Sequence, residues 1–266
     1  MSLLLHAVLV ATAVASPTPS PSPSPNPCAG LLAELNRPTI GYSPCVAQPG
    51  TAVFELGYQH QHNADASSHD QIGQGFLRFG LASRVEADVI GPSDLVRHAS
   101  GGSAYGLADF GLGFKYELDA TQRWQIALDG LYTEPNGARA FTSGDSTFTA
   151  NVDAAYQATP SLSFASTLAF GASGGFGATG EHARYGVFMP SVLALYQFDD
   201  RTQAYAEYVN VSRTAPDLGD SSFLDVGLQR LVHRTIELDV EYGHSLDGTT
   251  SQRFNYVGAG VGILVR

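Results

Sequence analysis

Residues 106–118 read GLADFGLGFKYEL. The residues at alternate positions form two sets, one apolar and one small or charged. The first set is apolar and consists of Ala108, Phe110, Leu112, Phe114, Tyr116 and Leu118. The second set is small or charged and includes Asp109, Gly111, Gly113, Lys115 and Glu117. A period of two puts the sets on opposite faces of a β-strand, whereas a helix would mix them and is disfavoured by the glycines. We therefore predict a strand over 106–118 with one wholly apolar face.

The same alternation returns along the chain from residue 51 onward. It occurs over residues 51–60, 72–81, 84–90, 124–132, 147–157, 162–171, 187–198, 203–210, 223–231, 235–243 and 254–265. Alternate connections are short, such as 82–83 and 232–234, and the intervening ones are long and polar, such as 61–71, 91–105, 133–146 and 172–183. Sorting of this kind is typical of outer-membrane barrels. The sequence predicts an all-β fold, an antiparallel up-and-down transmembrane β-barrel of about 12 strands over 51–266, with short periplasmic turns and longer extracellular loops.

The apolar faces of the predicted strands indicate whether the barrel lies in a membrane or in water. Twelve such faces turned to water would form a patch far larger than soluble monomers tolerate. Turned inward, as in a lipocalin-like soluble barrel, they would suit a barrel of about eight strands rather than twelve. We expect lipid to contact Phe110, Leu112, Phe114, Tyr116, Tyr156 and Tyr196, the three tyrosines forming a girdle just before short turns.

The opposite parity carries nearly all of the charge. The residues that we expect to line the lumen are Glu55, Arg78, Glu86, Asp88, Asp109, Lys115, Glu117, Asp129, Asp153, Glu207, Asp225, Glu237, Asp239 and Glu241, with Arg84 as a further base. Two interpretations stay open. The carboxylates are either ordinary solvated lumen charge with a few ion pairs, or a negative field that favours cations.

The N-terminal fifty residues differ from the rest of the chain. Residues 1–15 are apolar and end in Ala-Val-Ala, which predicts a secretory signal peptide, although a buried strand is the alternative. Residues 16–27 alternate Pro and Ser and predict an extended linker. Cys28 and Cys45 are the only cysteines, and in an exported protein they favour a disulfide over a lipid-attachment site. Residues 28–50 would then form a looped segment, either in the periplasm or plugging the lumen.

Composition excludes several classes of protein. The net charge of −11 and the single lysine disfavour nucleic acid and a polybasic membrane-surface tail. No apolar run is long enough for a transmembrane helix, so a membrane-spanning form must be a closed barrel. The partners that we expect are outer-membrane lipids and a small-molecule solute.

The chain resembles an outer-membrane, transporter-like family described as "putative MetA-pathway of phenol degradation". The resemblance rests on GLADFGLGFKYEL (106–118), FLRFGLASRVEADV (76–89) and VGLQRLVHRTIELDVEY (226–242) and covers about 51–266. It implies a small barrel in the bacterial outer membrane that passes small molecules, hydrophobic or aromatic ones among them. The family supplies no catalytic residues to carry over.

The sequence contains no recognisable set of residues that would form an active site. His60, His62, His69 and His244, with Asp65 and Asp70, could in principle bind zinc, but such residues near loops are more often merely hydrated. No Ser–His dyad can be singled out, and the glycine-rich stretch 171–180 lacks the Lys-Ser/Thr ending of a phosphate-binding loop. We predict no enzyme, no metal and no cofactor. The alternatives to a channel are a structural or adhesive barrel without an open pore and a lipid-modifying hydrolase.

Overall fold

The structure is a computed structural model that describes residues 28, 30–91, 93–177, 180–247 and 252–266. The expected signal peptide (1–15) and linker (16–27) lie outside the described residues. Within the described ranges, no helix is both long and apolar enough to cross a membrane.

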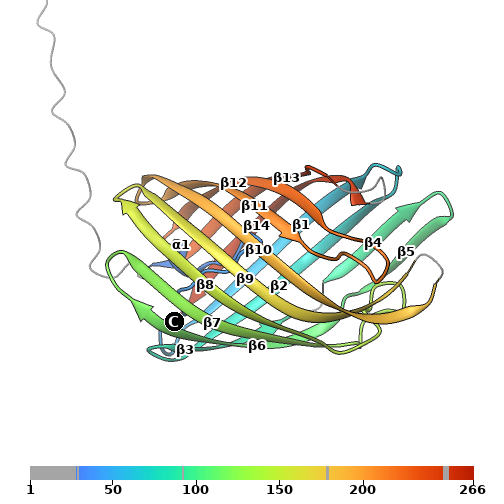
Figure 1. The fold of residues 1–266 in the computed structure, drawn as a ribbon. Coiled ribbons are helices and arrows are strands. Elements are labelled where there is room, and N and C mark those ends of the chain that lie inside the picture. The colour runs from blue at the N-terminus through green and yellow to red at the C-terminus, as the bar shows by residue number, and fades with distance from the viewer. Residues whose placement is uncertain (1–27, 29, 92, 178–179, 248–251) are drawn as a thin grey trace, which may run out of the picture.

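Twelve antiparallel strands form a closed barrel (Figure 1). The sheet has 14 strands, of which β4 and β5 form a side hairpin, and the remaining twelve close because β1 pairs with both β14 and β2. The barrel strands are β1 (Ala52–Asn63), β2 (Ser68–Ala82), β3 (Val85–Ile90), β6 (Phe110–Ala120), β7 (Trp124–Glu134), β8 (Thr147–Thr159), β9 (Leu162–Phe176), β10 (His182–Asp199), β11 (Thr202–Val211), β12 (Ser221–His233), β13 (Ile236–Ser245) and β14 (Phe254–Val265). The predicted architecture and strand number are confirmed.

The connections are shortest at the end of the barrel where β1 begins and β14 ends. The turns there cover 83–84, 121–123, 160–161, 200–201 and 234–235. The predicted loops 61–71 and 172–183 are wrong over much of their length, because β1, β2, β9 and β10 continue through them. Polar residues follow the apolar ones on these strands, so the end of the hydrophobic pattern did not mark the end of the strand.

The predicted loop 91–105 is also wrong. It contains a hairpin of β4 (Asp94–Ala99) and β5 (Gly102–Leu107), in which β4 pairs with the first residues of β2. In Figure 1 this hairpin projects at the extracellular end of the wall.

The predicted strand 106–118 starts too early, since β5 ends at Leu107 and β6 begins at Phe110. The cause is Asp109, whose carboxylate accepts the backbone N–H groups of Gly137 (2.8 Å) and Ser143 (2.9 Å). These contacts hold the extracellular loop after β7 against the chain between β5 and β6. The alternating sequence pattern therefore continues through residues that are not hydrogen-bonded as a strand.

Apolar side chains cover the outside of the barrel. Leu112 and Phe114 are each about half exposed, at 53% and 51%, and Phe110, Tyr116 and Tyr196 are also exposed. Tyr156 is half-buried because its ring lies 4.6 Å from that of Trp124 on the neighbouring strand.

A small apolar core lies inside the barrel, at the short-turn end. Leu31 of helix α1 (Leu31–Glu34), with Leu35 and Ala47, packs against Val53 of β1 and Leu264 of β14. This core seats the segment 28–50 on the inner wall.

Candidate functional site

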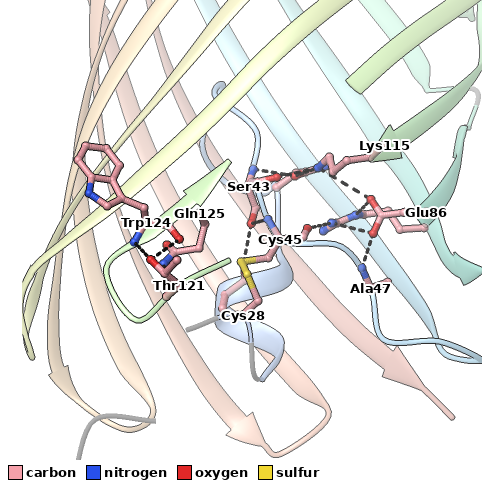
Figure 2. Close-up of a disulfide and its surroundings, with 12 residues drawn as sticks. Cys28, Ser43, Cys45, Ala47, Glu86, Lys115, Thr121, Trp124 and Gln125 are labelled. Carbon is pink, nitrogen blue, oxygen red and sulfur yellow. Dashed lines mark hydrogen bonds and ion pairs between the residues drawn. A yellow bond between two sulfur atoms is a disulfide. The ribbon is translucent and has the colours of Figure 1, made fainter. Parts of the chain in front are cut away.

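The segment 28–50 enters the lumen as a closed loop. Cys28 and Cys45 form a disulfide, as predicted, with their Cα atoms 5.3 Å apart. Figure 2 shows Glu86 and Lys115 pointing from the barrel wall toward the part of the segment that carries Ser43, Cys45 and Ala47. The site is therefore the lumen together with this segment.

Arg78 of β2 is the centre of the charged cluster beneath the segment. Its guanidinium lies 2.8 Å from Glu86 and 3.2 Å from Glu55, and it donates to the carbonyl of Cys45 at 2.9 Å. All three ionic side chains are completely buried. The backbone N–H of Ala47 donates to the same Glu86 carboxylate, so the segment and the wall share one ion pair.

Lys115 of β6 holds the next turn of the segment. Its ammonium group donates to the Ser43 carbonyl at 2.7 Å and to the Asn36 side chain at 3.4 Å. It also lies 5.7 Å from the centre of the Tyr42 ring, at a distance typical of a cation–π contact. The only lysine of the chain is thus used to anchor the segment.

Two wall carboxylates accept backbone N–H groups of the segment from opposite directions. Glu55 of β1 accepts from Asn36 (3.0 Å) and Arg37 (2.6 Å). Glu207 of β11 accepts from Ile40 and Gly41, both at 2.8 Å. The segment has little secondary structure of its own, so these carboxylates satisfy buried donors that would otherwise lack partners.

Arg37 reaches a third part of the wall. Its guanidinium lies 3.3 Å from Asp239 and 3.5 Å from Glu241 of β13, in the space left by Gly57 and Gly260. A Cβ atom at either glycine would overlap the guanidinium, so a larger side chain there would displace it.

These contacts show that the segment crosses the lumen. It is bonded to β1, β2, β3 and β6 on one side and to β9, β11 and β13 on the other. Most of the predicted lumen residues are buried around it: Glu55, Arg78, Glu86, Asp88, Lys115, Glu117, Asp129, Asp153, Glu207, Asp225, Glu237, Asp239 and Glu241.

Two of the expected lumen charges lie elsewhere. Asp109 is only partly buried and binds the loop after β7, as described above. The prediction that Arg84 lines the lumen is wrong. Arg84 is exposed in the β2–β3 turn and donates to the Leu118 carbonyl, because β2 has already ended there. Arg37, which strand parity could not predict, supplies a base inside the barrel instead.

A second cluster, also missed from the sequence, lies on β11, β12 and β14. The hydroxyls of Tyr205 and Tyr256 donate to the two oxygens of Asp225, at 2.9 and 2.6 Å. Their rings lie over Gly227 and Gly243, where a Cβ atom would collide with them. The parity of Tyr205 and Tyr256, opposite to that of the lipid-facing residues, was the signal that could have revealed them.

Among the titratable groups outside the strands, Glu34 and Asp109 have shifted pKa values that bear on the segment and its surroundings. Burial raises the pKa of Glu34 in α1 to about 7, against the opposing effect of Arg78. Burial also acts to raise the pKa of Asp109, but the N–H groups of Ser143 and Gly137 outweigh it and hold the pKa below its usual range.

The histidines near the extracellular end do not form a metal site within the described residues. No group of three or more His, Cys, Asp or Glu side chains there is placed to hold an ion. His60 instead lies 2.8 Å from Asp70 on the adjacent strand, and Tyr58 donates to the same carboxylate at 2.6 Å.

With this geometry in view, the sequence matches the family described as "Putative MetA-pathway of phenol degradation" over residues 29–263. The chain belongs to this family. No curated protein matches the sequence. The expected resemblance is confirmed, and it extends to the segment inside the barrel as well as the barrel itself.

Solved structures with the same fold are outer-membrane barrels. The COG4313 outer membrane channel from Pseudomonas putida F1 is 14% identical, with a TM-score of 0.62 over 83% of this chain and 97% of that one. The NanC porin is 12% identical, with a TM-score of 0.59 over 79% and 98%. The KdgM porin, in complex with disordered oligogalacturonate, is 13% identical, with a TM-score of 0.50 over 79% and 98%. The chain therefore has the fold of bacterial outer-membrane barrels.

Proposed function

We propose that this protein is a passive outer-membrane channel for small molecules, in which residues 28–50 act as a gate. The observation that carries the proposal is the way in which the lumen is filled. The wall strands close a complete barrel without the segment, and the segment is held by hydrogen bonds and ion pairs rather than by strand pairing.

An interior plug held by polar contacts can leave without unfolding the wall. Each polar contact to the segment exchanges for contacts with water, and a hydrogen bond to a charged group contributes only about 1.5–3 kcal/mol net. The closed sheet, by contrast, satisfies its own backbone groups around the whole circumference. A shift of the segment is therefore the conformational change that would open the lumen.

The charge of the wall restricts the class of solute. Buried carboxylates outnumber the bases Arg78 and Lys115 on the strands, and Arg37 leaves with the segment. Such a lumen disfavours anions and admits neutral or cationic molecules. Small neutral aromatic molecules fit this rule and the phenol degradation named in the family description.

A cross-link between the segment and the wall tests the gate. A Cβ atom at Gly41 would meet the Ser191 hydroxyl of β10, so the double variant Gly41→Cys, Ser191→Cys places two thiols in contact. We expect the oxidised variant to show no single-channel conductance in planar bilayers and the reduced variant to conduct. The wild-type protein, under the same oxidant and reductant, is the control for the native Cys28–Cys45 bond.

Two results would contradict the proposal. Equal conductance of the oxidised and reduced double variants would show that the segment is not a gate. A complete lack of conductance, even in a variant lacking residues 28–50, would favour a structural or adhesive barrel.

We infer also that the barrel is not an enzyme. In the clusters around the segment, Glu86 is bound by a base, Asp225 by tyrosines and Glu207 by backbone N–H groups, and none of these contacts joins a nucleophile to a general base. The Ser103–His98 contact (2.8 Å), with Asp70 3.9 Å from the same imidazole, lies on the exposed β4–β5 hairpin. Lipase or deacylase activity of the purified barrel, dependent on a single serine or histidine, would overturn this inference.

A further inference from the structure

The outer surface of the barrel carries a basic pocket at the extracellular end of β13, β14 and β1. It has a volume of about 480 Å³, and its lining includes His62, His244, Arg253 and Asn255. All four of these residues are exposed. No carboxylate is present among the described residues that line it.

The sheet register explains why these side chains converge. Asn255 of β14 is paired with His62 of β1 on one side and with His244 of β13 on the other. Neighbouring strands lie about 4.8 Å apart, so the two imidazoles flank the Asn255 amide in one row. Arg253 is two residues from Asn255 and lies just beyond this row, where its carbonyl accepts the N–H of Ala64 at 2.9 Å.

Three carboxylates at this end of the barrel have partners of their own, although Asp65 also interacts electrostatically with His62. Asp65 accepts from the Ser67 N–H and hydroxyl, Asp247 accepts from the Ser222 N–H, and Asp70 lies against His60. The pocket thus gathers one guanidinium, two imidazoles and the Asn255 side-chain amide on a chain whose net charge is −11.

An apolar groove lies below the pocket on the same strands. It has a volume of about 400 Å³ and is lined by Leu56 and Tyr58 of β1 and by Ala259 and Val261 of β14, with Gly57 and Gly73 beside them. Small residues create it: Ala259 stands between Tyr58 and Val240, which are both large and exposed. Ala259 is four residues from Asn255, which places the groove about 13 Å along the tilted strand, toward the membrane centre.

We propose that this seam binds a phosphorylated lipid of the outer leaflet, lipid A, with a phosphate in the basic pocket and an acyl chain in the groove over Ala259. The pocket lies just beyond the exposed apolar residues Tyr58, Tyr242 and Val257, where the outward face changes from apolar to polar. That level is where the phosphates of the outer leaflet lie. The Arg253 guanidinium can form a charge-assisted hydrogen bond with phosphate, and the two imidazoles and the Asn255 amide supply further donors.

Native mass spectrometry of the full barrel, purified in detergent and titrated with lipid A, tests the proposal. The triple variant His62→Ala, His244→Ala, Arg253→Ala should bind lipid A more weakly by about tenfold or more for each charged contact removed. The matched control is His182→Ala, Arg184→Ala at the extracellular end of β10, which should bind as the wild type does. Both residues are exposed there.

A second variant tests the groove without touching a charge. Ala259→Phe fills the groove while keeping an apolar outward face, and we expect several-fold weaker binding of lipid A. Leu128→Phe, an exchange at an exposed apolar position of β7, is its control and should have no effect.

Titrations with phosphatidylglycerol and with inorganic phosphate separate the sources of the phosphate group. Preference of the wild type for lipid A over both supports the proposal. Equal affinity for phosphatidylglycerol would overturn the assignment to lipid A, and equal affinity of the wild type and the triple variant for lipid A would overturn the site itself.

Discussion

Arg78 is the residue on which the interior depends most. It is completely buried and is the base that contacts both Glu55 and Glu86, while its remaining donor binds the Cys45 carbonyl. A buried ion pair adds little net stability by itself, because desolvation offsets the attraction. Removing one partner is different, since it leaves uncompensated buried charge.

We therefore expect Arg78→Met to destabilise the barrel by about 3–5 kcal/mol. The measurement is urea unfolding in detergent micelles, followed by the fluorescence of Trp124, the only tryptophan. Adding Glu86→Gln to Arg78→Met should recover part of the loss, because it removes one of the two carboxylates that Arg78 contacted, although Glu86 also lies 3.9 Å from Lys115.

Arg84→Met is the control for this substitution. Arg84 is exposed in the β2–β3 turn, so its loss should change stability by no more than about 0.5 kcal/mol. Unfolding of Arg78→Met at the same urea concentration as the wild type would show that the buried cluster is not coupled to stability.

Among the elements, the segment 28–50 carries a group whose titration we expect to affect how firmly the segment is held. Burial raises the pKa of Glu34 to about 7, above the ordinary value of 4.5. The docked state therefore binds a proton more tightly than the released state. Between pH 4.5 and about 7 it loses stability as the pH rises, because the docked carboxyl must ionise while buried.

We expect the segment to be held more firmly at pH 5 than at pH 8. Hydrogen exchange of the backbone amides of residues 33–47, corrected for the intrinsic dependence of exchange on pH, measures this directly. Glu34→Gln should make protection less dependent on pH. Glu181→Gln, at an exposed position before β10, should leave the dependence unchanged. Identical pH dependence in Glu34→Gln and the wild type would contradict the assignment to Glu34.

The strands show what the sequence could and could not reveal. Period-two alternation predicted which residues of β6 face outward, since lipid and lumen impose opposite chemistry on successive positions. It did not predict the start of β6. The alternation continues through Asp109, although this residue lies outside the strand and accepts the N–H groups of Gly137 and Ser143. It also missed the β4–β5 hairpin, because outside the membrane no apolar face distinguishes a strand from a loop.

The route of the segment was beyond sequence reasoning for a different reason. Its contacts join residues far apart in the chain, such as Gly41 with Glu207 and Arg37 with Asp239. Several of them use backbone N–H groups, which every residue except proline offers. The glycines of β14 indicated space inside the barrel, but the sequence did not predict that Arg37 would occupy it.

At the scale of the whole molecule, the outer and inner surfaces of the barrel differ in charge. The outside is apolar, the wall of the lumen is acidic, and the segment contributes Arg37 to the interior. Glu237, Asp239 and Glu241 stand on one face of β13 and form a column of carboxylates along the wall. When the segment moves away, Arg37 no longer compensates Asp239 and Glu241, so the open lumen is more negative than the closed one.

We therefore expect the conducting state to prefer K⁺ over Cl⁻, and the triple variant Glu237→Gln, Asp239→Asn, Glu241→Gln to lose much of that preference. Reversal potentials across planar bilayers with a salt gradient measure both. Asp199→Asn, Asp200→Asn, at the exposed end of β10 and in the turn after it, removes carboxylates away from the lumen and should retain the wild-type reversal potential. Because salt screens exposed charges most strongly, measurements at high ionic strength suppress any contribution of Asp199 and Asp200 and isolate the effect of the column. A wild-type channel without preference for K⁺, or an equal change in both variants, would show that the carboxylates of β13 serve only to hold the segment.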